Sequence, residues 1–156
     1  RFSKKIIDEL NEIIKSKKIA VLGWAFKKNT NDSRESASIY VTDHLLEEGA
    51  QVCIYDPKVE EEQMINDLYN LWESNNTSKS EIESKLNRLT VTQAHEECFN
   101  SSSCIAVLTE WDEFITYDWN SLIQNMEKQH VIIDGRNILD RDKISRVANK
   151  FIAIGK

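Results

Sequence analysis

Several cations follow a short apolar segment near the start of the chain, and they are the residues best suited to bind an anionic ligand. The apolar segment 18–22 predicts a buried strand, and Lys27, Lys28 and Arg34 lie in the polar stretch after it. A standard dinucleotide-binding turn has three glycines in the spacing G-x-G-x-x-G, which let the backbone approach a pyrophosphate. Only Gly23 is present here. An anion bound at this turn should therefore be recognised by side chains.

Two later residues join these cations if the predicted strands are parallel. Trp111 and Arg136 follow the apolar runs 104–108 and 131–133, which are typical of strands buried on both faces. In a doubly wound sheet of order 3-2-1-4-5-6, these strands end beside the first strand, where ligands bind. Lys27, Trp111 and Arg136 would then face one crevice. Two cations and an aromatic ring suit a ligand with a phosphate and a planar or sugar group.

Most of these residues also have a purely structural interpretation. Lys27 and Lys28 could be solvated loop residues, and Arg136 could serve only the turn after its strand. Asp56 follows a predicted strand in the place of a ribose-binding acid, but it precedes a proline. We therefore interpret Asp56 as a turn residue.

Arg34 belongs to a predicted helix start. Asp32 and Glu35 have the spacing of a capping box, which predicts a helix that begins at Asp32 and has Arg34 in its first turn. The helix dipole disfavours a cation there, so Arg34 should have an anionic partner. That partner is either a ligand or the neighbouring Glu35.

Composition excludes several classes of protein. The chain has 156 residues, enough for one domain with a proper core, and a formal net charge of −6. We therefore expect no general binding to nucleic acid or to an anionic membrane, and no apolar run is long enough to span a bilayer. The three cysteines, Cys53, Cys98 and Cys104, lie in or beside predicted strands and helices. We expect buried, reduced thiols in a cytoplasmic protein, and no metal site with the scattered histidines.

The apolar pattern alternates short strands with helices. It predicts an α/β fold, a doubly wound and mainly parallel Rossmann-like sheet flanked by helices. Helical spacing over 2–16 begins in mid-pattern, which we interpret as the end of a longer helix in a chain that has lost its upstream part. The predicted strands are 18–22, 51–55, 89–91, 104–108, 131–133 and 151–154. The other predicted helices run from Asp32 to Gly49, through 58–87 with an exposed loop at 74–80, and over 93–99, 118–127 and 140–149.

Four motifs together resemble a known family. They are Gly23-x-Ala25-Phe26-Lys27-x-x-Thr30-x-Asp32-x-Arg34-Glu35-Ser36, then Ile54-Tyr55-Asp56-Pro57, Thr109-Glu110-Trp111-Asp112 and Asp134-Gly135-Arg136. In this order they resemble the UDP-binding C-terminal domain of the UDP-glucose 6-dehydrogenases, in the eukaryotic form. The similarity extends from about residue 17 to residue 156.

This resemblance implies a function. Enzymes of that family oxidise UDP-glucose to UDP-glucuronate with two NAD, and an N-terminal NAD-binding domain is joined to the UDP-binding domain by a long helix. Residues 1–16 would be the end of that linker helix, and 17–156 the UDP-sugar-binding domain. By resemblance, Phe26, Lys27 and Arg136 bind the substrate and Arg34 reaches the NAD. The family's catalytic cysteine lies upstream, so we expect no catalytic residue in this chain and a homo-oligomer in the full-length protein.

Two alternatives remain open at this point. Dehydrogenases of UDP-N-acetylmannosamine or GDP-mannose share the architecture, although the segment 34–36 fits UDP-glucose best. A non-catalytic nucleotide-binding or oligomerisation module is the second alternative. A receiver-like signalling domain is disfavoured, because the first strand is followed by Gly23-Trp24 and not by acidic residues.

Overall fold

Six parallel strands form the centre of this computed structural model, which describes residues 2–11 and 17–154. The strands lie in the order β3-β2-β1-β4-β5-β6, and every neighbouring pair is parallel. This confirms the predicted doubly wound sheet. The strands are β1 (Lys18–Leu22), β2 (Gln51–Tyr55), β3 (Leu89–Val91), β4 (Cys104–Val107), β5 (Val131–Asp134) and β6 (Phe151–Ala153).

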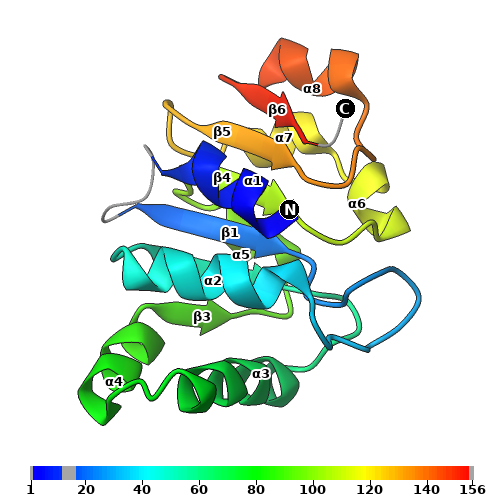
Figure 1. The fold of residues 1–156 in the computed structure, drawn as a ribbon. Coiled ribbons are helices and arrows are strands. Elements are labelled where there is room, and N and C mark those ends of the chain that lie inside the picture. Colours follow the sequence, from blue (N-terminus) through cyan, green and yellow to red (C-terminus); the bar gives the residue numbers. More distant parts are fainter. Residues whose placement is uncertain (1, 12–16, 155–156) are drawn as a thin grey trace.

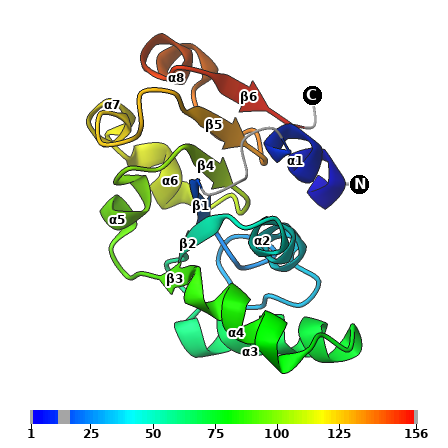
Figure 2. The same ribbon diagram turned by 90° about the vertical axis from the view of Figure 1, so that its left-hand side faces the viewer.

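Helices cover both faces of the sheet (Figures 1 and 2). They are α1 (Phe2–Leu10), α2 (Ala37–Glu47), α3 (Glu61–Ser74), α4 (Lys79–Asn87), α5 (His95–Phe99), α6 (Asp112–Thr116), α7 (Trp119–Ile123) and α8 (Arg141–Val147). The pair α1 and α2 lies against one face, and α5 and α7 lie against the other (Figure 2). The hairpin of α3 and α4 extends past the β3 end of the sheet.

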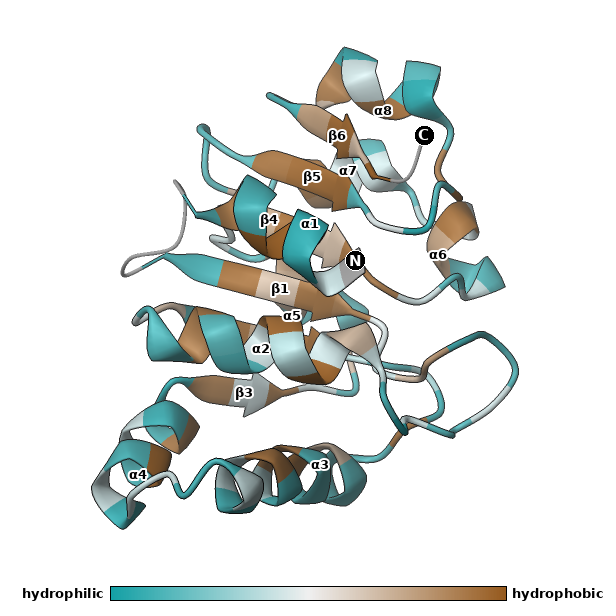
Figure 3. Ribbon diagram, viewed as in Figure 1, coloured by the Kyte–Doolittle hydropathy of each residue, from teal (hydrophilic) through white to brown (hydrophobic). Residues whose placement is uncertain are grey.

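The core is formed by the continuous apolar strands at the centre of the sheet. All residues of β4 and β5 are buried, and so are all of β1 after its first residue. Figure 3 shows this apolar band running through the sheet, while α4 is mostly polar. Buried aromatic side chains fill the space beside the strands, among them Trp24, Trp72, Phe99 and Phe114. Burial on both faces is why these segments read as unbroken apolar runs in the sequence.

Several element bounds differ from the prediction. The first helix is described only over Phe2–Leu10, and 12–16, where it was expected to continue, lie outside the described residues. The loop between α3 and α4 occupies 75–78, inside the predicted 74–80. The helix expected over 118–127 is only Trp119–Ile123. The stretch before it contains a further short helix, α6, which begins at Asp112.

The N-cap of the second helix lies four residues later than predicted. Its N-cap is Ser36, whose side chain accepts a hydrogen bond from the backbone N–H of Ser38, and α2 starts at Ala37. The capping box of Asp32 and Glu35 was therefore wrong, because Asp32 binds Arg34 and Glu35 has a positive φ of 59°. The predicted end was right, since Gly49 follows the helix with a φ of 92°.

No helix in the described part of the chain has the length and apolarity needed to cross a bilayer.

Candidate functional site

The loop between β1 and α2 begins at the carboxyl edge of the sheet with Gly23, which is tightly packed. This residue has a φ of 104°, and a Cβ atom there would lie 2.4 Å from Oγ1 of Thr109. The Gly23 N–H donates to the Tyr55 carbonyl at 2.8 Å, and the Thr109 hydroxyl donates to the Ala25 carbonyl at 2.6 Å. The start of the loop is therefore fixed against the ends of β2 and β4. Only glycine fits at this position.

A buried carboxylate holds the same loop from the other side. Asp56 accepts five hydrogen bonds, from the backbone N–H groups of Trp24, Ala25, Lys58 and Val59 and from the indole Nε1–H of Trp111. Their lengths run from 2.6 to 3.0 Å. The interpretation of Asp56 as a turn residue is thus confirmed. It also joins three segments that are far apart in the sequence.

Phe26, Lys27 and Arg136 come together at this edge. The Arg136 guanidinium donates from Nη1 to the carbonyls of Phe26 and Leu108, each at 3.3 Å, and Nη2 lies 3.0 Å from Oε1 of Glu110. The Lys27 ammonium lies 5.5 Å from the centre of the Phe26 ring. Phe26 is 40% exposed although it is a large apolar side chain. Two cations and an exposed aromatic ring therefore form one cluster, which we call the edge cluster.

The turn after β5 positions Arg136. Asp134 at the end of that strand is buried, and its carboxylate accepts from the backbone N–H groups of Arg136 and Leu139, at 3.1 and 2.8 Å. These bonds fix the backbone of the turn. The carbonyls of Phe26 and Leu108 then hold the guanidinium over the ends of β1 and β4. A fixed planar donor of this kind is suited to phosphate or sugar oxygens.

The other two cations of the loop have carboxylate partners. Lys28 forms an ion pair with Asp112, with 3.1 Å between the two charged atoms, which agrees with a structural role for this lysine. Arg34 lies before α2, not in its first turn, and its Nη2 is 2.7 Å from Oδ2 of Asp32. This guanidinium lowers the pKa of Asp32 to about 2, chiefly through the side-chain hydrogen bond. The Arg34 side chain is 88% exposed, so its guanidinium lies in solvent.

Trp111 does not face the crevice, contrary to the prediction. It is only 8% exposed, and its Nε1–H is bound by Asp56 at 3.0 Å. A buried indole N–H needs an acceptor, and the carboxylate below the loop supplies one. Trp111 therefore supports the loop from inside the fold. The exposed ring at this edge belongs to Phe26.

Asp67 is a second support of the loop that the sequence did not reveal. Its Oδ2 accepts from the indole Nε1–H of Trp24 at 2.8 Å and from the hydroxyl of Ser33. The Gln63 amide of the same helix, α3, donates to Ser33 and to the carbonyl of Asn31. The sequence analysis predicted a helix here but gave its polar residues no role. No local sequence signal separates them from residues that bind a distant loop.

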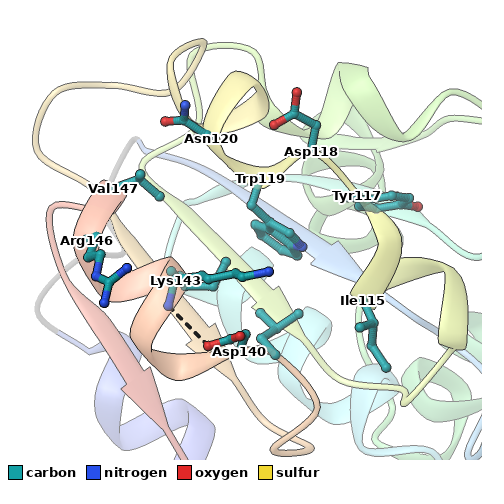
Figure 4. Close-up of a pocket in the computed structure, with 11 residues that line it drawn as sticks. Ile115, Tyr117, Asp118, Trp119, Asn120, Asp140, Lys143, Arg146 and Val147 are labelled. Atoms are coloured by element: carbon teal, nitrogen blue, oxygen red, sulfur yellow. Dashed lines mark hydrogen bonds between the residues drawn. The ribbon is translucent and has the colours of Figure 1, made fainter.

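A cavity of about 480 Å³ lies away from the edge cluster, between α6, α7 and α8 (Figure 4). Trp119 forms its floor, and Lys143, Arg146, Asp118 and Asp140 surround it. Two cations are balanced there by two carboxylates, so the cavity has no excess charge that would attract an anion. None of Phe26, Lys27, Arg34 and Arg136 lines it.

The cysteines are free and buried, as expected, and the described residues contain no group of histidine, cysteine and acidic side chains that could hold a metal. Burial strongly raises the pKa of the Cys104 thiol.

Comparison with known proteins places the chain. Residues 20–141 match the model of the UDP-glucose/GDP-mannose dehydrogenase family, UDP binding domain. The chain belongs to this family. It is 43% identical to UDP-glucose 6-dehydrogenase of Drosophila melanogaster over all of its length, which is 32% of that protein. For the enzymes named UDP-glucose 6-dehydrogenase from Caenorhabditis elegans and UDP-glucose 6-dehydrogenase 4 from Arabidopsis thaliana the identities are 41% and 36%. The chain spans about a third of each of these relatives.

Solved structures of dehydrogenases in this group share the fold. An NDP-N-acetyl-D-galactosaminuronic acid dehydrogenase from Methanosarcina mazei Go1 aligns with a TM-score of 0.67 and 23% identity, over 99% of this chain and 28% of the other. A UDP-glucose dehydrogenase from Pyrobaculum islandicum aligns with a TM-score of 0.58 and 22% identity, over 97% and 28%. At these identities the likeness concerns the fold alone.

The described residues do not form a dinucleotide cradle of their own, although the fold is Rossmann-like. Gly23 is packed against Thr109, and the next two N–H groups of the turn are bound by Asp56. Asp56 has its oxygens filled by five donors, so no lone pair is left for a ribose hydroxyl. The turn of this family's UDP-binding domain thus differs chemically from a standard NAD-binding turn.

Proposed function

We propose that the edge cluster binds the diphosphate of UDP-glucose, and that the chain is the substrate-binding domain of an NAD-dependent UDP-glucose 6-dehydrogenase. One observation carries the assignment of the site. Arg136 binds the Phe26 carbonyl at 3.3 Å, although 110 residues separate the two in sequence. The fold thereby brings together the three residues that the sequence motifs single out for the substrate. The family membership supports the class of ligand.

The three residues have different parts in this proposal. Lys27 supplies a mobile ammonium that neutralises phosphate charge, and Arg136 supplies a guanidinium of fixed orientation. Phe26 offers an exposed ring against which the planar or sugar part of the ligand packs. Two carbonyls and Glu110 engage the guanidinium and fix its orientation at the edge of the sheet.

UDP-glucose is favoured over the other nucleotide sugars by the named relatives. Proteins called UDP-glucose 6-dehydrogenase match the whole chain at 36–43% identity. The oxidation of UDP-glucose to UDP-glucuronate, with two NAD as oxidant, belongs to the full-length protein. The chain's own residues bind and orient the substrate. The domain that carries NAD is expected upstream, and a homo-oligomer and a cytoplasmic location complete the proposal.

Arg34 is proposed to reach an NAD molecule held by that other domain. Its side chain is 88% exposed, and within the described part of the chain its ion-pair partner is Asp32. A charged group in that position can contact a phosphate that arrives from outside the domain. The contact requires the guanidinium to share or exchange its carboxylate partner.

A binding experiment with two variants and a matched control tests the site. Hydrogen bonds to charged groups contribute roughly 1.5–3 kcal/mol to binding. Lys27→Ala and Arg136→Ala should therefore each lower the affinity for UDP by about ten- to a hundredfold. Lys28→Ala removes a neighbouring cation that is paired with Asp112, and should change the affinity less than about threefold. Arg136→Lys should recover part of the loss. The measurement is calorimetric titration of UDP into the purified chain, with a melting curve for each variant.

If Lys27→Ala and Lys28→Ala reduced the affinity for UDP equally, the binding would reflect general charge attraction and not a specific site. Normal binding by a folded Arg136→Ala variant would remove Arg136 from the site altogether.

A further inference from the structure

Two of the buried cysteines touch each other across the interface between the sheet and a helix. The Cys98 thiol of α5 donates to the sulfur of Cys53 in β2, with 3.5 Å between the two Sγ atoms. Both are free thiols. We propose that Cys53 and Cys98 are a reversible oxidation site, at which a hydroperoxide such as hydrogen peroxide converts the pair into a disulfide that links β2 to α5.

The geometry needs little change for this bond to form. A disulfide has an S–S length of about 2.05 Å, so the sulfurs must approach by roughly 1.5 Å. They are already in direct contact, and rotation about the two Cα–Cβ bonds can supply a movement of that size. The residues are 45 positions apart in sequence, on elements that pack on each other. The linkage would close a long loop and fasten α5 to the sheet.

Cys53 is 3% exposed and lies at the wall of a second cavity. A cavity of about 330 Å³ opens at the amino edge of the sheet, opposite to the edge cluster, and Cys53 lines it together with Lys18 and Arg88. The Lys18 ammonium is fixed there by the carbonyls of Glu97 and Asn100, at 2.7 and 2.8 Å. Glu97 lines the same cavity, so two cations stand against one carboxylate there, and reactive cysteines are found in such net positive surroundings. No local sequence pattern reveals this setting, because Lys18 and Arg88 are both far from Cys53 in the sequence.

The chemistry of the pair agrees with the geometry. Donation from Cys98 lowers the pKa of the Cys53 thiol, and Lys18 acts in the same direction, against the effects of burial and of Glu97. Cys53 is therefore the attacking sulfur and Cys98 the resolving one. Cys104 makes a natural comparison, since it is fully buried at the start of β4 and burial alone raises its pKa.

The reaction balances in two steps. The Cys53 thiolate attacks one oxygen of the peroxide, the O–O bond breaks, and hydroxide leaves as the sulfenic acid forms. The Cys98 sulfur then attacks the sulfenic sulfur, its proton goes to the departing oxygen, and water is released. The two thiols lose two electrons in total and the peroxide gains them. A small thiol such as dithiothreitol reverses the change by exchange.

Peptide mapping after peroxide treatment of the folded chain tests the proposal. We expect a linked peptide pair that contains Cys53 and Cys98, lighter by two hydrogens and restored by dithiothreitol, while Cys104 stays reduced. Cys53 should be oxidised at least about tenfold faster than Cys104. The oxidised chain should melt about 5–10 °C higher than the reduced chain, because the crosslink restricts the unfolded state.

Two variants separate this site from general oxidation. Cys98→Ser should leave a sulfenic acid on Cys53 that dimedone traps, whereas Cys104→Ser should still form the disulfide at the normal rate. The same rates are measured in low concentrations of urea. Cys53 and Cys98 that stay reduced, or that react only at concentrations where the chain unfolds and Cys104 reacts equally, would overturn the proposal.

Discussion

At the scale of single residues, Arg34 and Asp32 show how a local ion pair displaces a predicted helix start. The sequence offered Asp32 as an N-cap, and in the structure its carboxylate binds the guanidinium two residues later instead. Ser36 takes over the cap. Both residues are among the types favoured at N-caps, so pattern alone could not choose between them.

This ion pair has a measurable titration. The pKa of Asp32 lies near 2, below its ordinary value of 3.8, so the carboxylate binds a proton less readily in the folded chain. The pair therefore stabilises the fold at pH values above 3.8, and that contribution is lost as the pH falls through about 2. In the Arg34→Gln variant we expect the pKa of Asp32 to move back up towards 3.8. NMR titration of the Asp32 carboxyl carbon in both proteins gives the two values.

The same substitution addresses the cofactor. In the full-length protein, Arg34→Gln should weaken the binding of NADH and leave the binding of UDP unchanged. Fluorescence titration measures the NADH affinity. An unchanged pKa of Asp32 would contradict the ion pair, and unchanged NADH affinity would contradict the role of Arg34 at the cofactor.

At the scale of elements, the segments buried on both faces were predicted best. The runs 18–22, 104–108 and 131–133 became β1, β4 and β5 to within one residue at each end, because a strand buried on both faces has no polar position. The short helices were predicted less well. Helix α7 has five residues where ten were expected, because its N-cap, Asp118, lies at the predicted start but its end carries no glycine or proline.

The site itself was predictable in part, for a physical reason. Lys27 and Arg136 follow the ends of parallel strands, so the strand order alone brings them to one edge. The contacts of Asp56 and Asp67 with the loop depend on side-chain packing across elements. Trp111 was misplaced for the same reason, because its acceptor lies 55 residues away.

Among the contacts between elements, we expect the loss of the Asp56 hydrogen bonds to lower the stability of the fold most. Asp56→Asn keeps the shape but puts an amide N–H₂ in place of an oxygen that faces N–H donors, so at least two of the five bonds are lost. We expect the free energy of unfolding to fall by roughly 2–4 kcal/mol. Urea denaturation measures it.

Asp112→Asn is the matched control for this prediction. Its side chain is 72% exposed and pairs only with Lys28, so the change should stay within about 0.5 kcal/mol. Similar effects of the two substitutions would mean that the Asp56 bonds add nothing to the stability of the fold.

At the scale of the whole molecule, the chain combines a Rossmann-like sheet with a turn that cannot cradle a dinucleotide. The described residues contain the edge cluster at the carboxyl edge of the sheet, and among them no acid, base and nucleophile converge on it. Such a domain can bind one partner of a hydride transfer without performing it.

We therefore expect the 156-residue chain to bind UDP but to produce no NADH from UDP-glucose and NAD. Absorbance at the NADH band measures this, with a full-length relative as the positive control. Steady NADH formation by the purified chain would show that the domain contains reacting groups that we have not assigned.

The carboxylate of Asp56 has a consequence for how the binding edge behaves in time. The amides of Trp24 and Ala25 belong to a loop, yet they are buried and bound to an anion that two other segments also hold. Amides of this kind exchange with deuterium only when the surrounding structure opens. They should therefore be protected for as long as those of β1, so the loop under Phe26 and Lys27 would open with the sheet as one cooperative unit.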